Sequence, residues 1–498
     1  MDEQRGDEPS LLPAKRVRWD DSVLPHRTNT PGTAAATATC SSNKAPPVPP
    51  SCSANDAIRL CSAIGRKTAG AEEKEGVDVD EGCRPDFTHQ LFDEERIEGF
   101  EDGGVSIRIF YTPTSLDFLV KIQTSENDAS RTTAVLSGLS KALPPENFTT
   151  DELKFYEELE GRRRDFKPPG ARVYEYSREG TTFSVYKATG EDLGACEYHA
   201  RAQCLAPWFI ETADAIDLTD DRWEVFYLFQ EEPPQGVLGE KWRPAALAGY
   251  FTAFGFRNPV KGVSLRICQA LVLPQFQRQG HGKALLSFLY GLARSRKSVF
   301  EITVEDPAPG FEKVRNLVDA RTLRDLDVFP ADVISPDAWK RPSKDVVQAA
   351  REAAKLTVSQ VEIGFDILKA CHLPEVKDYA REDSMCPMAT ATASSTTTAA
   401  DAAPTATAAL SHRNTAAASA APGDGSENAT AVDDKRKSYR LMVKRRLLKR
   451  HGEELSTDSA TRKRQLDELY RDVEPGLLSL GAKLRKEGRR EAAAAIRS

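Results

Sequence analysis

The stretch from Leu265 to Asp306 constrains the fold more than any other part of the chain. It begins with Leu265–Leu273, which is rich in branched side chains and too apolar for either face to lie in water. Such a run predicts a buried strand. Pro274 ends it, a helical pattern starts at Ala284, and Ser298–Val304 reads as a second strand. Strand, helix and strand in this order predict a βαβ unit with parallel strands and a right-handed crossover.

The loop before this helix has the composition of a phosphate-binding turn. It reads Gln277-Arg278-Gln279-Gly280-His281-Gly282-Lys283, with the spacing Gln-x-x-Gly-x-Gly. Glycines let the backbone approach a ligand, and the N–H groups at a helix N-terminus favour a pyrophosphate. Arg278 and Lys283 add positive charge. The alternative is a tight strand-to-helix connection whose glycines serve turn geometry alone.

Two acids, Glu305 and Asp306, directly follow the second strand. Open α/β sheets bind ligands at the carboxyl ends of their strands, so the acids and the loop are expected at one cleft. The alternative for these acids is a capped strand end without a chemical role.

Several motifs resemble the catalytic subunits of type B histone acetyltransferases, a family of the GNAT superfamily. The matching segments are Gln277–Lys283, Ile302–Pro307, Trp208–Ala213, Asp220–Trp223, Pro85–Phe92 and Tyr439–Leu447. The resemblance covers residues 84–383 and then 435–450. It implies an α/β fold, namely a GNAT mixed sheet with an N-terminal α/β domain and a C-terminal helical domain. It also implies acetyl transfer from acetyl-CoA to a lysine.

The resemblance assigns the catalytic roles to three acids. Lysine in water has a pKa of about 10.4, so a base must remove a proton before the amine attacks a thioester. Glu305 matches the family's general base, and Glu211 and Asp306 match supporting acids. No cysteine stands at a catalytic position, so we expect direct attack in a ternary complex, and we interpret Cys268 as a buried core residue.

The resemblance also implies binding segments. The backbone of Ala270, Leu271 and Val272 would pair with the pantetheine arm, and the loop from Gln277 to Lys283 would hold the pyrophosphate. The histone tail would contact Asp93, Glu94 and Glu95 and also Phe254, Gly255 and Phe256. Acids would attract a basic tail and aromatic rings would pack on its aliphatic stems. The alternative for the acidic segment is a solvated turn.

Four residues depart from the family pattern. Arg278 stands where glycine is usual, Ala308 replaces a small polar residue, and Phe254 and Phe256 lack expected hydroxyls. Cofactor binding is expected to tolerate these changes. Whether selectivity for the histone tail also survives them is left open by the sequence.

Composition divides the chain into six segments. Residues 1–83 and 384–434 are poor in large apolar side chains and are expected to be disordered. The resemblance implies an N-terminal α/β substrate-binding domain over 84–191 and a GNAT acetyl-CoA-binding domain over 192–330, and we expect a helical domain over 331–383. The GNAT domain should contain a helix over Cys204–Asp217. Residues 435–498 form a basic helical segment in this interpretation.

The segment Lys435–Arg450 allows two interpretations. Nine of its sixteen residues are Lys or Arg, interrupted by leucine and valine, so it predicts a basic amphipathic helix. It would form a docking surface for DNA, RNA or an acidic partner, or else pack as a solvated helix along the helical domain.

The overall composition favours a protein of a reducing compartment. The nine cysteines show no regular spacing, and Cys40, Cys52 and Cys61 lie in sequence that reads as disordered. We find no metal-ligand pattern, membrane span or signal peptide. The net charge of −7 suits a basic partner such as a histone tail. Lys15–Arg18 is a nuclear-import signal or a solvated charge cluster.

We predict a lysine acetyltransferase, and the resemblance implies that its substrate is the N-terminal tail of free, newly made histone four. The resemblance further implies a β-propeller histone chaperone as partner and a location in nucleus and cytoplasm. Two alternatives remain: a GNAT enzyme for another amine, and a scaffold that binds histone or acetyl-CoA without turnover.

Overall fold

The protein is described by a computed structural model that covers residues 50–63, 81–125, 129–144, 147–233, 243–373 and 425–497. It separates into two compact units, residues 1–311 and 312–498, and each is described by itself. Cys40 and Lys15–Arg18 lie outside the described residues, as does most of the predicted disordered insert over 384–434.

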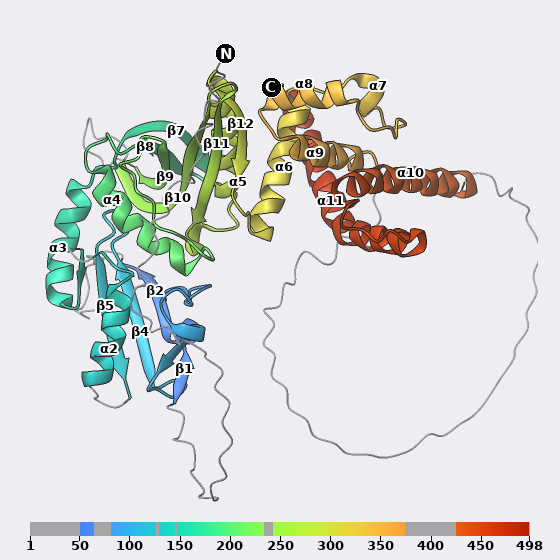
Figure 1. Cartoon of the computed structure of the whole chain (residues 1–498). Coiled ribbons are helices and arrows are strands. Elements are labelled where there is room, and N and C mark those ends of the chain that lie inside the picture. Colours follow the sequence, from blue (N-terminus) through green and yellow to red (C-terminus); the bar gives the residue numbers. More distant parts are fainter. Residues whose placement is uncertain are drawn as a thin grey trace, which may run out of the picture. The chain divides into compact units, whose positions relative to one another are not determined.

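The N-terminal part of the first unit is a small α/β domain (Figure 1). Its four-stranded sheet has the order β2-β4-β5-β6, and β1 pairs with β3 in a two-stranded sheet. The strands are β1 (Ser51–Ser53), β2 (Ile58–Ser62), β3 (Arg96–Glu98), β4 (Val105–Tyr111), β5 (Phe118–Thr124) and β6 (Phe148–Thr149). The helices are α1 (Ala54–Ala57), η1 (Asp93–Glu95), α2 (Ala129–Ser140) and α3 (Glu152–Asp165). Phe155 and Leu159 of α3 pack with Phe110 and Leu119 of the sheet.

The prediction of disorder up to residue 83 is wrong for residues 50–63. β2 pairs in parallel with β4, and β1 pairs with β3. Ile58, Leu60 and Cys61 are buried in the core of the small domain, and so is Cys52. A strand of this length carries little periodic signal of its own, and its stability comes from partners more than thirty residues away.

The second part of this unit is a six-stranded mixed sheet of order β12-β11-β10-β9-β8-β7. Its strands are β7 (Ala171–Arg178), β8 (Thr181–Ala188), β9 (Trp223–Glu232), β10 (Arg243–Asn258), β11 (Gly262–Val272) and β12 (Val299–Val304). β11 and β12 are parallel and joined by α5 (His281–Ser295), which confirms the predicted βαβ unit. The predicted boundary at residue 192 is wrong, because β7 and β8 pair into this sheet.

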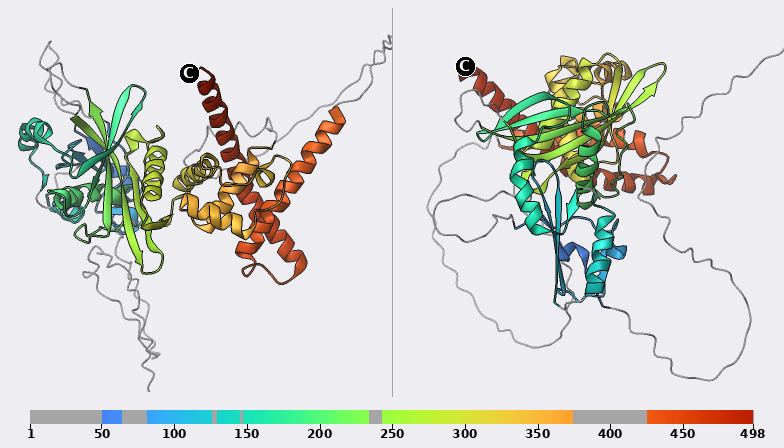
Figure 2. Two further views of the ribbon diagram at one scale, coloured as in Figure 1. Left: turned by 90° about the horizontal axis from the view of Figure 1, so that it is seen from above. Right: turned by 90° about the vertical axis from the view of Figure 1, so that its left-hand side faces the viewer.

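Helices cover both faces of this sheet (Figure 2). Side chains alternate between the faces along β9. Tyr227 contacts Tyr198 of α4 (Ala195–Ala202) at a ring-centroid distance of 5.0 Å, whereas its neighbour Phe226 contacts Phe288 of α5 at 6.1 Å. The central strand β9 is therefore covered on both faces, by α4 and by α5, whereas the edge strand β7 is largely exposed.

The helix predicted over Cys204–Asp217 is also wrong. Only η2 (Gln203–Trp208) is helical, with 3-10 geometry, and the chain then continues as turns and bends through Glu211. Pro207 lies inside this short element and Thr212 has a positive φ of 55°. Both features are unfavourable in a longer α-helix.

The second unit is helical. It holds α6 (Pro309–Asp325), apart from the first residues of that helix, α7 (Ala331–Ile334), α8 (Lys344–Ala354), α9 (Val358–Ala370), α10 (Gly425–His451) and α11 (Ser459–Arg497). The buried side chains of α8 and α9 include Val347, Ala350, Ala354, Val361, Phe365 and Leu368, whereas Val358 at the start of α9 is 40% exposed. The unit starts earlier than the predicted residue 331, because Ala320 and Leu323 of α6 pack against Gly364 of α9. The predicted disorder up to residue 434 is wrong from Gly425 onward.

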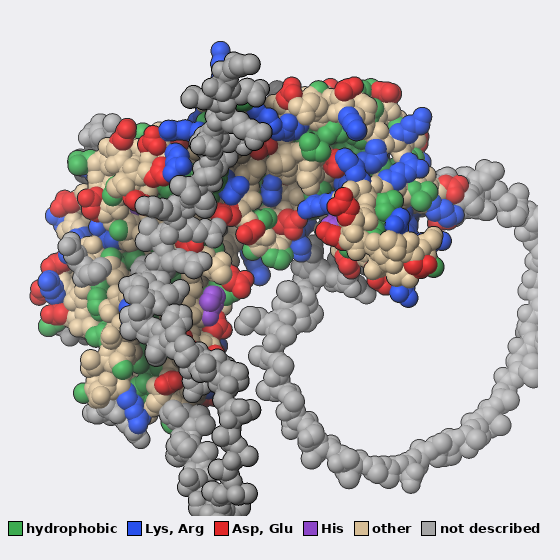
Figure 3. Space-filling model, viewed as in Figure 1, with side chains coloured by type: hydrophobic (Ala, Val, Ile, Leu, Met, Phe, Trp, Pro, Cys, Tyr) green, Lys and Arg blue, Asp and Glu red, His purple; other side chains and the backbone are tan. Residues whose placement is uncertain are grey.

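The basic segment Lys435–Arg450 forms most of α10 and is packed into this unit. Tyr439, Met442 and Leu447 are buried. Arg446 lies 2.6 Å from the buried carboxylate of Asp366, and Lys449 lies 2.9 Å from Glu362. Basic and acidic side chains are interspersed over this unit in Figure 3. The segment therefore has a structural role, and the docking of a polyanion stays a prediction.

Candidate active site

The parallel strands β11 and β12 separate at one end of the sheet. They pair from Val263 to Ile267, and the backbone N–H of Glu305 still bonds the Ile267 carbonyl at 2.9 Å. Beyond a register shift at Cys268, β11 continues to Val272 and pairs only with β10 among the described strands. No described strand therefore pairs with the edge of Ala270, Leu271 and Val272 that faces away from β10, which is the position predicted for pantetheine.

The close approach of β10 and β11 depends on Gly249. A Cβ atom at this position would lie 2.2 Å from the Leu271 carbonyl oxygen, far inside van der Waals contact. On the opposite edge the Val272 carbonyl accepts a hydrogen bond of 2.9 Å from the Gln277 side chain. The Val272 carbonyl is therefore already hydrogen-bonded within the chain. Ala270 is the better placed backbone group for hydrogen bonding to a cofactor.

The predicted phosphate loop ends at the N-terminus of α5. Arg278 and Gly280 adopt left-handed conformations, with φ of 61° and 86°. The first helical hydrogen bond runs from the Ala284 N–H to the Gly280 carbonyl, so the N–H groups of His281 and Gly282 are outside the helical ladder. Such N–H groups, with the helix dipole, favour an anion. Gln277, Arg278 and Gln279 are exposed beside them.

The side chain of His281 anchors this loop, whereas its backbone N–H is one of the groups at the helix N-terminus. Its Nδ1 atom lies 2.7 Å from the Tyr176 hydroxyl, and its ring lies 4.3 Å from the Phe183 ring. Burial, with a smaller effect from Arg178, lowers the pKa of His281 from its usual 6.5 to about 4. A neutral, buried imidazole holds the start of α5 against the β7–β8 hairpin.

Arg178 is a residue that the sequence interpretation missed. It ends β7, and a Cβ at Gly280 would lie 2.9 Å from its Nη2 atom. Its guanidinium therefore lies at the N-terminus of α5 and adds positive charge beside the predicted phosphate loop. Arg178 is about a hundred residues before the loop, so no local motif indicates this contact.

Glu305 and Asp306 lie immediately after β12, as predicted. The Glu305 side chain is 28% exposed, and its Oε1 atom is 4.0 Å from Nη1 of Arg266. Asp306 is exposed and has a positive φ of 30°. Both acids thus stand where β11 and β12 separate, beside the open edge of β11.

Glu211 lies in the turn after η2, exposed to solvent. Two residues further on, the Ala213 carbonyl accepts a hydrogen bond from Gln90, and the Asp214 carbonyl accepts one from Gln269 of β11. Gln269 is two residues after Ile267, whose carbonyl accepts the hydrogen bond from the N–H of Glu305. The segments that carry Glu211 and Glu305 are therefore both hydrogen-bonded to the same part of β11.

The predicted tail-binding segments differ in their accessibility. Phe254 is only 1% exposed and lies under the guanidinium of Arg222, 4.6 Å from it. Phe256 is half-buried and has Arg266 above its ring at 4.4 Å. Phe256 is therefore the better candidate for direct contact with a substrate. Gly255 separates the two residues along β10, and their rings pack edge to face with centroids 4.7 Å apart.

The acidic segment is the 3-10 turn η1. Glu95 accepts hydrogen bonds from the backbone N–H of Thr88 at 3.1 Å and from the Asn55 side chain at 3.0 Å. It therefore stabilises the turn, whereas Asp93 and Glu94 are exposed to solvent.

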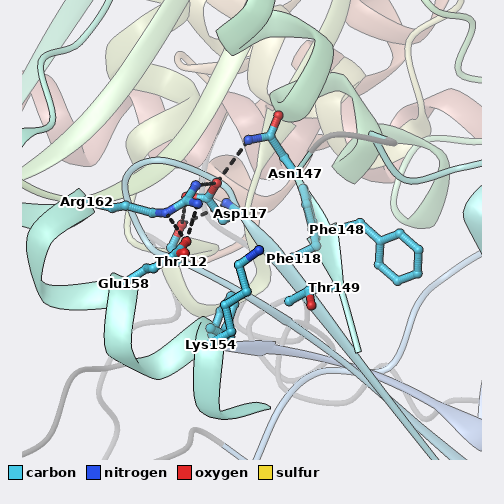
Figure 4. Close-up of a pocket in the computed structure, with 10 residues that line it drawn as sticks. Thr112, Asp117, Phe118, Asn147, Phe148, Thr149, Lys154, Glu158 and Arg162 are labelled. Atoms are coloured by element: carbon cyan, nitrogen blue, oxygen red, sulfur yellow. Dashed lines mark hydrogen bonds and ion pairs between the residues drawn. The ribbon is translucent and has the colours of Figure 1, made fainter. Parts of the chain in front are cut away.

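The described residues contain a small polar cavity elsewhere, in the N-terminal domain (Figure 4). It encloses about 70 Å³ around Asp117, which accepts hydrogen bonds from Asn147 and Arg162. This volume is well below that of ordinary cofactor pockets, which is roughly 300–1,000 Å³, and none of the predicted site residues lines the cavity.

Two further properties concern the described residues only. They contain no group of three His, Cys, Asp or Glu side chains arranged to hold a metal ion. Their helices also include none with enough length and apolar character to cross a membrane.

Comparison with known proteins adds independent information. Residues 50–211 match the family model described as "Histone acetyl transferase HAT1 N-terminus". The proteins named histone acetyltransferase type B catalytic subunit in Rattus norvegicus and Homo sapiens are each 31% identical over 297 residues, covering 57% of this chain and 68% of theirs. A Dictyostelium discoideum protein of the same description is 28% identical over 309 residues, covering 59% of this chain and 63% of its own.

One solved structure is also similar in part. It is an aminoglycoside acetyltransferase from an uncultured soil metagenomic sample, 16% identical, covering 25% of this chain and 78% of its own, with a TM-score of 0.19. A score of this size carries no argument about the fold.

Proposed function

Because the chain belongs to the family of type B histone acetyltransferase catalytic subunits and is an acetyl-transferring enzyme, we propose that it acetylates lysines in the N-terminal tail of free histone four. The acetyl donor in this proposal is acetyl-CoA. The observation that carries it is the open edge of β11, with Glu305 and Asp306 at one end and the phosphate loop at the other.

The proposed reaction is a direct transfer within a ternary complex. The lysine nitrogen attacks the thioester carbonyl, Glu305 accepts a proton from the amine, and the sulfur of CoA leaves and is protonated. Glu305 is suited to this role because its side chain is partly buried where the two parallel strands separate. Catalysis of this kind depends on positioning and on electrostatic stabilisation.

The supporting acids take different positions in the proposal. Asp306 follows Glu305 and is exposed, so it is placed to orient the substrate ammonium before deprotonation. Glu211 approaches from the turn after η2 and would assist the removal of the proton. The exposed Asp93 and Glu94 would attract the basic tail, and Phe256 would pack on an aliphatic stem.

Cys268 offers a route through an acetyl-enzyme, which we do not favour. Its thiol donates a weak hydrogen bond to the Arg266 carbonyl at 3.6 Å, at the register shift of β11. It is half-buried, in place of the predicted full burial. The acids that follow β12 suit direct attack better.

The test is acetyl transfer to a histone-four tail peptide, with acetyl-CoA affinity measured beside it. Glu305→Gln should lower kcat by roughly 10²–10⁴-fold, the range expected for loss of a general base, while acetyl-CoA still binds. Glu211→Gln and Asp306→Asn should have smaller effects on kcat. Glu197→Gln, a change of an exposed acid on α4, serves as the matched control.

The outcomes separate the alternatives. A wild-type protein that binds acetyl-CoA but leaves the tail unmodified contradicts the substrate, and equal turnover of unrelated amines favours a broader acetyltransferase. Binding of histone without any transfer favours a scaffold. Full activity in Glu305→Gln contradicts the base assignment alone.

We also propose that the protein works with a β-propeller histone chaperone, in nucleus and cytoplasm. The support is the family resemblance alone. Co-purification with a tagged chain from fractionated cells is the test, and recovery of histone without a β-propeller protein in both fractions contradicts the partner.

A further inference from the structure

The loop that carries Glu211 is held by contacts from outside itself. We name Phe209–Ile216 the acid loop. Its residues form turns, bends and a single bridge, without a helical or strand ladder. Thr212, directly after Glu211, has φ of 55°, a strained conformation for a β-branched residue. A short strained loop of this kind keeps its shape only when neighbouring groups fix it.

Two glutamines bond neighbouring carbonyls of the acid loop. Nε2 of Gln269 donates to the Asp214 carbonyl at 2.6 Å. Nε2 of Gln90 donates to the Ala213 carbonyl at 3.1 Å. These carbonyls lie two and three residues after Glu211, so the pair of bonds fixes the backbone beside Thr212.

Gln269 is itself rigidly placed. It is 6% exposed, its backbone N–H donates to the Thr252 hydroxyl at 3.0 Å, and its Oε1 accepts from the Tyr250 hydroxyl at 3.3 Å. It also directly precedes Ala270, the backbone group best placed for the cofactor. The position of the acid loop is therefore linked to the strand edge that would hold the acetyl donor.

Gln90 provides the corresponding link to the substrate side. It lies three residues before Asp93, at the start of the acidic turn. The same segment is fixed to the start of the acid loop, because the N–H groups of Asp86 and Phe87 donate to the Trp208 carbonyl at 2.8 and 3.2 Å. The acid loop thus joins the cofactor strand to the acidic segment.

We propose that Gln269 and Gln90 are positioning residues that hold the acid loop so that Glu211 faces the reacting groups. The proposal rests on the proposed function, because it needs Glu211 to act in the transfer. In this proposal the two glutamine side chains contribute to catalysis indirectly, without contact with the substrate.

The first experiment compares Gln269→Ala and Gln90→Ala with Gln230→Ala, a control on β9 of the same sheet. Loss of positioning should lower kcat for the tail peptide by about 10- to 100-fold, with little change in KM or in acetyl-CoA affinity. The melting temperature and acetyl-CoA binding identify folded variants. If Gln269→Ala does not fold, Gln269→Glu keeps the size of the side chain and removes the Nε2 donor.

A double-mutant cycle tests whether the glutamines act through Glu211. In the Glu211→Gln background, Gln269→Ala should cause no further loss of kcat, because the group that it positions is already absent. Losses that multiply in the double variant overturn the proposal, and so does full kcat in both folded glutamine variants.

The same cycle separates this inference from the proposed function. If Glu211→Gln alone keeps full activity, the assignment of Glu211 is wrong, and this is visible without any change at Gln269. If Glu211→Gln is impaired and the glutamine variants are not, only the positioning role is wrong.

Discussion

Arg278 has a backbone conformation that its side chain does not favour. The family pattern has glycine at this position, and the structure gives Arg278 a φ of 61°. The left-handed region costs an ordinary residue roughly 1–2 kcal/mol relative to glycine. Arg278 occupies this position despite the strain, and its positive charge in the predicted phosphate loop gives a physical reason.

Arg278→Gly is predicted to have two opposite effects. It should raise the free energy of unfolding by about 1 kcal/mol, because strain is relieved, and it should weaken acetyl-CoA binding several-fold, because a cation near the pyrophosphate is lost. Lys355→Gly is a matched control, since Lys355 has φ of 55° in the second unit. It should stabilise without changing affinity. Unchanged affinity in Arg278→Gly contradicts a role in phosphate binding.

At the scale of secondary structure, the parallel strand β2 illustrates how a short element depends on distant partners. It pairs with β4 from Ile58 to Ser62, and Leu60 is 2% exposed. Locally its sequence offers too few residues for a periodic pattern. The sequence interpretation predicted disorder here because the surrounding residues have low-complexity composition. In the structure, the strand completes the core of the N-terminal domain.

Leu60→Ala tests the role of this strand. Truncation of a buried leucine should lower the free energy of unfolding by about 2–5 kcal/mol, since it removes apolar contacts and leaves a cavity. Leu153→Ala, at a side chain that is 76% exposed on α3, should change it by less than about 0.5 kcal/mol. If neither Leu60→Ala nor Leu153→Ala changes the free energy of unfolding measured by chemical denaturation, residues 50–63 do not form part of the core.

For the whole molecule, two buried histidines of the first unit make stability depend on pH. His199 of α4 is buried, and burial lowers its pKa to about 3; burial also lowers the pKa of His281 to about 4. Both values are below the usual 6.5, so between pH 6.5 and 4 the unfolded chain binds protons that the folded chain does not. This contribution to stability is complete above pH 6.5 and is lost as the pH falls below it.

Unfolding by denaturant at pH 7.0 and 5.5 is the corresponding measurement. Each histidine should lower the free energy of unfolding by about 1.4 kcal/mol at the lower pH. His281→Gln should remove its share of this difference, although it also weakens the bond to Tyr176. The same pH difference in wild type and His281→Gln would show that His281 is not buried in its neutral form.

Several features of the fold and site followed from local sequence. The apolar run of β11, the glycine spacing before α5 and the acids after β12 are all contiguous, and together they predict the βαβ unit and place Glu305 at the end of a strand. The structure confirms this unit. The functional roles of the acids and of the binding segments stay predictions.

Other features were decided by tertiary structure. The turn around Glu211 in place of a helix, the contact of Arg178 with Gly280 and the bonds of Gln90 and Gln269 to the acid loop all join distant residues. Periodicity and composition report which face of an element is apolar and where a turn is favoured. They carry no information about which distant donor meets which carbonyl, so the sequence determined the central βαβ unit, and long-range contacts determined the geometry around its open edge.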